Sequence, residues 1–458
     1  MPLFVNLKSF ELMRSGSILL FSLLLLTLGC TKDQTSDTAE YENKLKDFMR
    51  DASLTGNYEY YILPDEDDLN AIPQDPKNRL TREKVELGKL IFFDTGLAMD
   101  AARPSGMGTY SCATCHIPTA GFRPGVAQGV ADGGHGYGFN GDTRVKNTEY
   151  NDNELDVQSA RPLSLINVAY VTNTFWNGQF GATEVNEGTD GVWDLREDTQ
   201  NNFLGFEGIE AQNIQGLKDH RITINKDLLD QYGYTPMFDT AFPGVAPAER
   251  YTRLYASLAV SAYIRTILGN QAPFQQWLKG NKEAMSIDEV KGGILFFGKA
   301  RCSNCHFRPN LGSLEFHALG VKDMYQSPSF NAAESDRRNL GRGGFTMNEE
   351  ENYQFKVPQL YNLADAPFFF HGSSKTTLDE VIDYKLQART ENLNIPQDKL
   401  SIKFRPIDIS AKEREQLISF LEVSLRDPNM DRYAPETVPS GFCFPNNDTQ
   451  SQIDLGCQ

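Results

Sequence analysis

Two stretches of the chain decide its fold, SCATCH at residues 111–116 and RCSNCH at residues 301–306. Both contain the pattern CxxCH, in which two thiols bind the vinyl groups of a c-type haem and the next His is placed to bind its iron. The pattern predicts two covalently attached haems, with His116 and His306 as iron ligands. The alternative is one zinc ion held by all four thiols. Because a His directly follows each pair, we favour two haems, attached through Cys112, Cys115, Cys302 and Cys305.

A similar phrase precedes each motif. Residues 80–93 (LTREKVELGKLIFF) have helical spacing with Thr81 as a cap, and residues 286–297 (SIDEVKGGILFF) repeat the pattern. In both phrases a Gly stands four residues before a Phe-Phe pair. We interpret this as an internal duplication and predict two related domains, at residues 79–278 and 279–435.

The remaining pattern predicts a mostly α architecture, because strand signals are weak and scattered. Residues 248–268 are expected to form one long amphipathic helix that closes the first domain. Residues 411–425 are expected to form a helix that packs against the second haem domain. Loop-rich insertions are expected at residues 117–160, 177–210 and 313–356.

The N-terminus has the character of a targeting segment. Lys8 and Arg14 precede an apolar run at residues 17–29 that is too short to span a bilayer comfortably. The run ends at Gly29-Cys30, which resembles a bacterial lipoprotein signal; an ordinary signal peptide is the alternative. We expect a signal peptide at residues 1–29 and a periplasmic protein, tethered to the membrane by a lipid on Cys30. Residues 30–78 would be the tether and a loosely packed arm.

The cysteines support export. Of seven, one is assigned to lipid and four to haem, which leaves Cys443 and Cys457. In an oxidising compartment these two are expected to form a disulfide that closes a C-terminal tail at residues 436–458.

The formal net charge of −17 excludes nucleic acid as a partner, because phosphate binding needs a basic surface. An acidic surface suits a basic protein partner that is steered electrostatically. The acidity could equally serve solubility alone.

An electron relay and an enzyme differ at the haem face opposite the motif His. Chemistry at the iron needs a coordination position there that is open or can be vacated. Of the six histidines, His135 lies in a glycine-rich loop, DGGHGYGFNG, that could bring a ligand to the iron and withdraw it. An exposed loop His is the alternative interpretation.

Several sequence phrases, taken in their order along the chain, give further information. The following phrases occur in this order between residues 80 and 428: LGKLIFF, SCATCH, the His135 loop, ARPLSLINVAYVTNTFWNG, GIEAQNIQGLKDHR, CSNCH, EFHALGV, FKVPQLYNL and PFFFHGSSKTTLDEVIDY. In this order the chain resembles the bacterial di-haem cytochrome c peroxidase family, which includes MauG-type enzymes. The resemblance implies two cytochrome c-like domains, a peroxide-reactive first haem and an electron-relay second haem.

The resemblance also implies roles for individual residues. His135 matches a removable sixth ligand of the first haem, Trp176 a Trp between the haems, and Gln212 a Gln beside the first haem. Trp176 could also be a plain core anchor. The family more often reads Phe-Trp-Asp-Gly-Arg here, so the chain departs from it at Asn177 and Gln179.

A peroxidase also needs a group that moves a proton between the two peroxide oxygens. The family uses a Glu about ten residues after the Gln, where this chain offers His220 instead. His220 is therefore the predicted acid/base residue, and the alternatives are Glu207, Glu210 and Asp219.

For the second haem, the family has a Met or a Tyr in the helix after His371, where this chain reads Tyr384-Lys385. Tyr384 is the predicted sixth ligand, with a Tyr bound to a haem propionate as the alternative. Other candidates are Met324 and Met347, while His317 and His371 would hold propionates or water. Calcium between the domains is a further candidate cofactor, although Arg161 stands where the family has an Asn ligand.

Three functions follow as hypotheses. The first is reduction of hydrogen peroxide at the first haem, with electrons from a small periplasmic cytochrome or copper protein. The second is a MauG-like oxidation of a partner protein, and the third is electron transfer without catalysis. A homodimer is one expected assembly.

Overall fold

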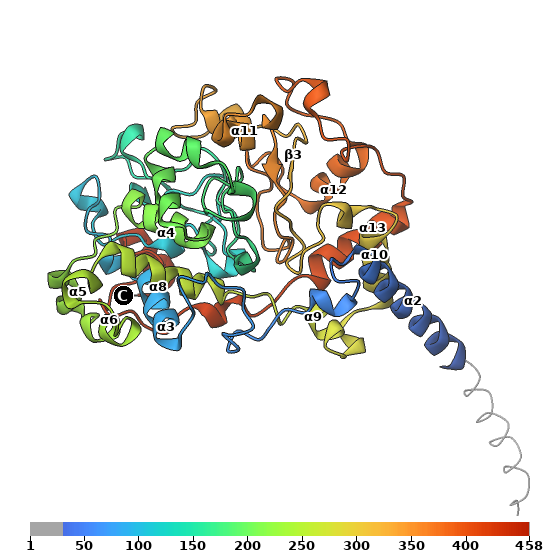
Figure 1. Cartoon of the computed structure of the whole chain (residues 1–458), viewed down its shortest axis with the longest axis horizontal. Helices are drawn as coiled ribbons and strands as arrows, with labels where there is room; N and C mark the ends of the chain where they lie inside the picture. Colours follow the sequence, from blue (N-terminus) through green and yellow to red (C-terminus); the bar gives the residue numbers. More distant parts are fainter. Residues whose placement is uncertain (1–30, 458) are drawn as a thin grey trace, which may run out of the picture.

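The computed structural model describes residues 31–457; the predicted signal peptide and Cys30 lie outside this range. Two groups of helices lie side by side (Figure 1). The first group comprises α3 (Arg82–Phe93), α4 (Gly208–Asp219), α5 (Lys226–Tyr232), α6 (Thr235–Ala241), α7 (Pro247–Arg250) and α8 (Arg253–Arg265). The second comprises α2 (Thr31–Ala52), α9 (Pro273–Leu278), α10 (Ile287–Phe297), α11 (Gly341–Thr346), α12 (Leu378–Gln387) and α13 (Ala411–Ser419). A last helix, α14 (Thr449–Leu455), returns to the first group, where it contacts the His135 loop.

Strands are few, as predicted. In residues 31–457 two short antiparallel pairs form, β1 (Gly134–His135) with β2 (Val145–Lys146), and β3 (Phe316–His317) with β4 (Phe355–Lys356). Long loops with 3₁₀ turns connect the helices. No helix in this described part is both long and apolar enough to cross a membrane. The mostly α prediction is confirmed, whereas the limits of the two domains stay a prediction.

The two phrases before the CxxCH motifs form equivalent helix crossings. Helix α3 packs against α8, and α10 packs against α13. A methyl group on Gly88 would lie 1.9 Å from the carbonyl oxygen of Ala259, and one on Gly292 would lie 2.0 Å from that of Gln416. Only glycine allows such close backbone approach. The repeated Gly is therefore the residue that sets the same crossing twice, which supports the interpretation as a duplication.

The caps of these helices are also as expected. The Thr81 hydroxyl accepts a hydrogen bond from the Lys84 amide at the start of α3. At the start of α10, Ser286 and Glu289 form a reciprocal capping box. Both arrangements satisfy amides that the first helical turn leaves without partners.

The prediction of one long amphipathic helix at residues 248–268 is wrong in two respects. The chain breaks at Tyr251–Thr252, so that α7 and α8 are separate helices. From Ala256 to Arg265 every residue of α8 is buried, because α3 and α4 both pack against it. Arg265 stays charged there by binding the carboxylates of Glu207 and Glu210.

The expectation of a loosely packed arm at residues 31–75 is also wrong. Helix α2 packs along α10 in the second group, and Leu45 and Met49 are fully buried there (Figure 1). Further along, the Leu63 amide donates to the side-chain oxygen of Gln275 at 2.8 Å. The arm is polar in composition, but its few apolar side chains recur at helical spacing and form one packed face.

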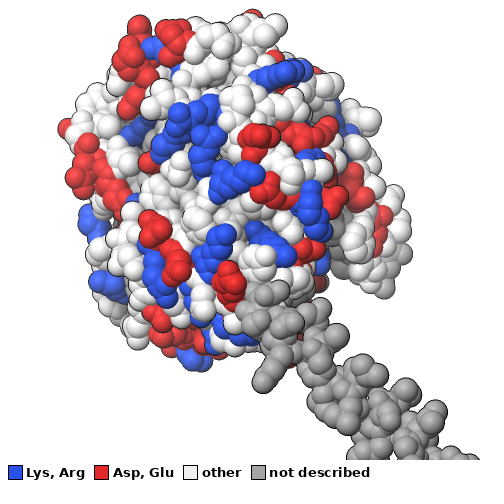
Figure 2. All heavy atoms as spheres, turned by 90° about the vertical axis from the view of Figure 1, so that its right-hand side faces the viewer, with Lys and Arg blue, Asp and Glu red and all other residues white. Residues whose placement is uncertain are grey.

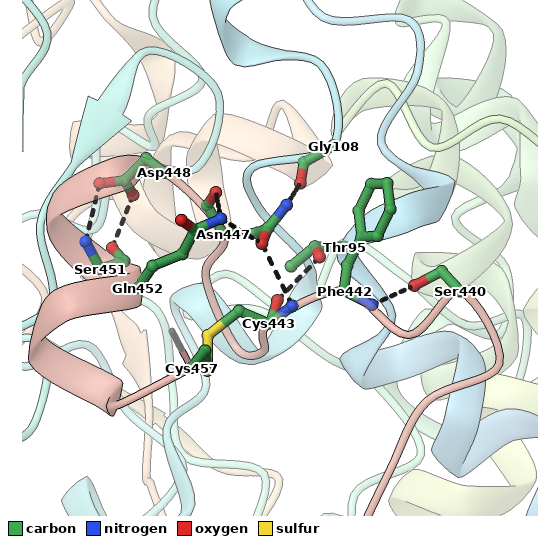
Figure 3. Close-up of a disulfide and its surroundings, with 10 residues drawn as sticks. All are labelled: Thr95, Gly108, Ser440, Phe442, Cys443, Asn447, Asp448, Ser451, Gln452 and Cys457. Carbon is green, nitrogen blue, oxygen red and sulfur yellow. Dashed lines mark hydrogen bonds between the residues drawn. A yellow bond between two sulfur atoms is a disulfide. The ribbon is translucent and has the colours of Figure 1, made fainter.

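The C-terminal tail contains the predicted disulfide between Cys443 and Cys457 (Figure 3). The Thr95 hydroxyl donates to the Cys443 carbonyl at 2.9 Å, and the Asn447 amide donates to the Gly108 carbonyl at 3.0 Å. The tail is therefore fastened to loops of the first helix group, near the first CxxCH motif.

Candidate active site

Both CxxCH motifs face one cavity between the two helix groups. Its volume is about 740 Å³, and its lining includes Cys112, Cys115 and His116 of the first motif and Cys305 and His306 of the second. Each motif begins with a 3₁₀ turn, at Cys112–Thr114 and at Cys302–Asn304. None of the four cysteines is in a disulfide.

The shared zinc site is excluded by the positions of the thiols. Among residues 31–457, the one group of three or more side chains that could jointly hold a metal is Cys305, Glu315 and His317. It contains a single thiol. The two cysteine pairs are thus separate, as two haem attachment sites require.

Each motif histidine is prepared to bind iron. Nδ1 of His116 is 3.1 Å from the carbonyl oxygen of Phe122, and Nδ1 of His306 is 2.8 Å from that of Leu311. A carbonyl only accepts, so Nδ1 carries the proton and Nε2 keeps its lone pair. Burial lowers the pKa of each imidazole to about 4, which keeps both neutral at physiological pH.

Three buried cations test whether haem fits the cavity. Arg123, Arg161 and Lys356 line it and are at most 7% exposed. None of them forms an ion pair with a carboxylate in the described part of the chain. Burial lowers the pKa to about 10 for Arg123, about 9 for Arg161 and about 7 for Lys356. Buried charges without counter-ions are costly, and the propionates of two haems would supply the missing negative charge. The residues present therefore fit the group.

The predicted residues of the first haem site do come together. Helix α4 carries Gln212, and His220 caps its C-terminal end; both line the cavity that contains His116. Nδ1 of His220 is 2.7 Å from a carboxylate oxygen of Asp156. The Asp156 side chain is 6% exposed and that of His220 is 38% exposed. The carboxylate is therefore buried, while the imidazole is partly exposed where it lines the cavity.

This pairing changes the acidity of His220. Burial lowers the pKa of the imidazole, but the charge of Asp156 and the hydrogen bond to it more than offset this, so the pKa is raised above its ordinary value. Sequence reasoning missed Asp156, because no motif marks it and it lies 64 positions before its partner.

Of the three alternative acid/base residues, two lie outside the cavity and one lines it. Arg265 binds the carboxylates of Glu207 and Glu210, and neither residue lines the cavity. Asp219 does line it, and burial raises the pKa of its carboxyl group. His220 and Asp219 remain as the groups that could move a proton there.

His135, the predicted removable ligand of the first haem, lies outside the lining of the cavity in this structure. It belongs to β1. The amides of Tyr137 and Gly138 donate to one oxygen of Asp454, at 2.9 and 2.7 Å, and the Gly136 amide donates to Asp448. The C-terminal tail therefore holds this loop outward, a long-range contact that the local sequence does not reveal.

Trp176 lines the same cavity as His116 and His306. Its indole N–H donates to the Arg161 carbonyl at 2.7 Å. Its ring meets His371 edge to face at 6.0 Å, and His371 stacks on Phe355 at 3.7 Å. Nε2 of His371 is 2.9 Å from a carboxylate oxygen of Asp323, which fixes the ring.

Tyr384, the predicted sixth ligand of the second haem, lies outside the lining of the cavity in this structure. Its hydroxyl donates to the Leu319 carbonyl at 2.6 Å. Met324 is buried away from the cavity, and Met347 is 47% exposed at the surface. Lys385, the next residue of α12, does line the cavity near His306.

Comparison with known proteins finds similar di-haem proteins. A family profile described as di-haem cytochrome c peroxidase matches residues 82–283. The chain is 28% identical to the methylamine utilization protein MauG of Methylorubrum extorquens, over 78% of this chain and 82% of that protein. It is 25% identical to the cytochrome-c peroxidase IdrP1 of Denitromonas iodatirespirans, over 79% of this chain and 86% of the relative. The chain is therefore similar to di-haem cytochrome c peroxidases and to MauG proteins.

A solved structure supports the fold. The crystal structure of a MauG-like protein associated with microbial copper homeostasis aligns with a TM-score of 0.56 and 22% identity, over 82% of this chain and 97% of that one. The protein is an oxidoreductase, and its similarity to di-haem peroxidases implies haem c as cofactor.

Two departures from the family pattern compensate each other. Where the di-haem peroxidases more often have Asp and Arg after the Trp, the Asn177 amide here donates to the side-chain oxygen of Gln179 at 2.9 Å. Gln179 in turn donates to Asp198. Asn177 and Gln179 thus form a neutral, hydrogen-bonded pair in a buried position.

The expected calcium ligand is also replaced. The guanidinium of Arg161 donates to the backbone carbonyls of Pro124 at 2.9 Å and Val126 at 2.7 Å, and more weakly to that of Ala127. Carbonyl oxygens of this kind are typical calcium ligands in proteins. Here a side-chain cation already occupies them.

Proposed function

We propose that the protein reduces hydrogen peroxide to water at the first haem, with electrons that enter through the second haem from a small redox protein. The observation that carries this is the His220–Asp156 pair, which faces the same cavity as His116. A proton-transfer group opposite a haem iron ligand is what peroxide cleavage requires and what a simple electron relay does not need.

The roles of the residues follow from their positions. When bound, the haem held by His116 supplies an iron that binds peroxide and takes up its oxidising equivalents. His220 takes a proton from the inner peroxide oxygen at Nε2 and returns it to the outer oxygen, which leaves as water. Asp156 orients the ring and stabilises its charged form, and Gln212 offers a side-chain amide to the bound peroxide. With two electrons and two further protons, one peroxide yields two waters.

Trp176 is proposed to carry electrons between the sites. It is the aromatic side chain between the motifs whose ring contacts His371 and whose N–H is fixed by a backbone carbonyl. A fixed, partly buried aromatic ring in contact with its neighbours suits such a role better than a mobile one.

A second candidate is a MauG-like oxidation of a partner protein. The observation that favours it is that no Met lines the described cavity near His306, together with the likeness to MauG. We further propose that the protein works in the periplasm, tethered through Cys30.

A peroxide titration of the haem-loaded protein tests both functions. For the first, we expect steady consumption of peroxide when a reduced small c-type cytochrome is supplied. A long-lived oxidised state with little turnover would favour the second function. No spectral response to peroxide in any redox state would contradict both.

Variants make the test specific. His220→Gln should lower turnover by about 10²- to 10⁴-fold, the usual contribution of a positioned acid/base group. Lys218→Gln is the matched control, because Lys218 lies on the same helix end but faces away from the cavity. Equal turnover in the two variants would transfer the role to Asp219.

A further inference from the structure

The side of the cavity near His306 offers few atoms that can bind iron. No Met thioether and no Tyr phenol is among them, since Met324, Met347 and Tyr384 all lie outside the lining. The nitrogen bases that do line it in the described part are those of His317, His371, Lys356 and Lys385.

Three of these nitrogen bases are already engaged. His317 has Nε2 at 2.9 Å from Glu315 and Nδ1 at 3.1 Å from the Ser401 hydroxyl, so both ring nitrogens have partners. His371 is fixed by Asp323 and stacked on Phe355. The Lys356 ammonium donates to the Asn173 carbonyl at 2.6 Å.

Lys385 differs from all of them. Its amine forms no hydrogen bond and no ion pair with any residue in the range 31–457, and its one recorded contact is with the ring of Phe370, 5.6 Å from the centroid. It lies within electrostatic range of Cys302, Cys305 and His306. An amine without a polar partner beside a haem attachment site has a lone pair available for another ligand.

Helix geometry explains why Lys385 and not Tyr384 faces the cavity. Successive residues of an α-helix point about 100° apart around its axis. The Tyr384 ring packs on Phe370 and Phe404 and its hydroxyl binds the Leu319 carbonyl, which fixes the orientation of α12. The next side chain, Lys385, therefore points in another direction around the helix and lines the cavity.

We infer that Nζ of Lys385 is the sixth ligand of the haem iron held by His306. The amine binds in its neutral form and releases its proton to solvent. A primary amine is a stronger electron donor than a thioether and stabilises the ferric state. This assignment rests on the second haem of the proposed function, but not on peroxide reactivity at the first.

The test compares four variants of the haem-loaded protein by electron paramagnetic resonance, near-infrared magnetic circular dichroism and spectroelectrochemical titration. Lys385→Ala should convert the second haem to a high-spin ferric state. Lys385→Met should give a thioether signature and raise the reduction potential of that haem. Tyr384→Phe and the surface control Lys412→Met should keep the wild-type signals; Lys412 is 62% exposed and pairs with Asp288.

Unchanged spectra in both Lys385 variants would overturn the assignment and indicate that the amine binds a propionate. Loss of the wild-type signal in Tyr384→Phe would overturn it in favour of the phenol. Haem content and circular dichroism confirm folding, and the unbranched Met keeps the volume of Lys if the Ala variant fails to fold. Peroxide consumption, read at the first haem in the same samples, reports separately on the proposed function.

Discussion

At the scale of single residues, the chemistry of His220 depends on Asp156. A buried carboxylate 2.7 Å from Nδ1 raises the pKa of the imidazole and orients Nε2 toward the cavity. Deprotonated His220 is the form that can accept a proton from peroxide, so catalysis should increase as pH rises through this raised pKa. The ion pair itself contributes to stability below the pKa of a free His and loses that contribution as pH rises through the folded pKa.

Asp156→Asn tests this dependence. Removing the charge leaves burial, which lowers the pKa, as the dominant effect on His220. The rising limb of kcat/KM against pH should therefore move to lower pH, and the maximum should fall because the ring is less well oriented. Stopped-flow peroxide kinetics across the pH range provide the measurement. A limb that does not move would show that another group titrates in catalysis.

Trp176 allows a second test at this scale. Phe in its place keeps an aromatic ring against His371 but leaves the Arg161 carbonyl without its donor. If the indole carries electrons, Trp176→Phe should slow transfer between the sites while haem content and peroxide binding stay the same. Rapid-mixing spectroscopy of the half-reduced protein follows this directly. A variant that is less stable but transfers electrons at the wild-type rate would identify Trp176 as a core anchor only.

At the scale of helices, the repeated Gly is the residue that the fold tolerates least to change. Because a methyl group on Gly88 would overlap the backbone of α8, Gly88→Ala should destabilise the protein by about 1–3 kcal/mol or more. Gly244→Ala is the matched control, since nothing lies within 4 Å of its added carbon. Denaturant unfolding of the haem-loaded variants gives the difference. Equal midpoints for the two would contradict the close crossing.

The C-terminal tail is the second element with a predicted effect. Asp454 accepts two backbone amides of the His135 loop, and these bonds lower the pKa of its carboxyl group. Asp454→Asn should weaken them and speed amide exchange at residues 134–146. In the wild type the same contact is present above the ordinary Asp pKa and should be lost as pH falls through the lowered value.

Hydrogen-exchange mass spectrometry measures the loop directly, with Asp190→Asn, an exposed Asp of the first helix group, as control. If exchange at the loop is the same in both variants, the tail does not restrain His135. An increase confined to Asp454→Asn would support the tail as the element that keeps this loop outside the cavity.

Contacts between segments far apart in the sequence limit what can be predicted from the sequence alone. The haem motifs, the duplicated helices and the disulfide depend on residues that are close in sequence, and these predictions hold. The roles of His135 and Tyr384 follow from the resemblance, but Asp454 holds the loop of His135 and the Leu319 carbonyl binds Tyr384, and both partners lie far along the chain. A spacing pattern places a residue near a site and does not say which of two helical neighbours faces it.

At the scale of the whole molecule, the charge is less simple than the net value of −17 indicates. On the face around α10 and α13, Lys and Arg lie among Asp and Glu (Figure 2). Pairs such as Lys299–Glu413 and Arg414–Asp383 account for part of this mixture. The face seen there is not a uniform acidic surface, so the excess of negative charge alone does not mark it as the docking site of a basic donor.

The region where the two helix groups meet is not expected to bind calcium. Arg161 lies in this region: its guanidinium binds carbonyls of residues 124–127, while its amide donates to the His371 carbonyl at 2.7 Å. A divalent cation at the same carbonyls would meet a buried positive charge, which opposes binding at short range. Activity, haem spectra and thermal unfolding should therefore be the same after dialysis against a chelator and after calcium is added back. Loss of activity on chelation, restored by calcium but not by magnesium, would show that a cation site exists elsewhere and that Arg161 does not replace it.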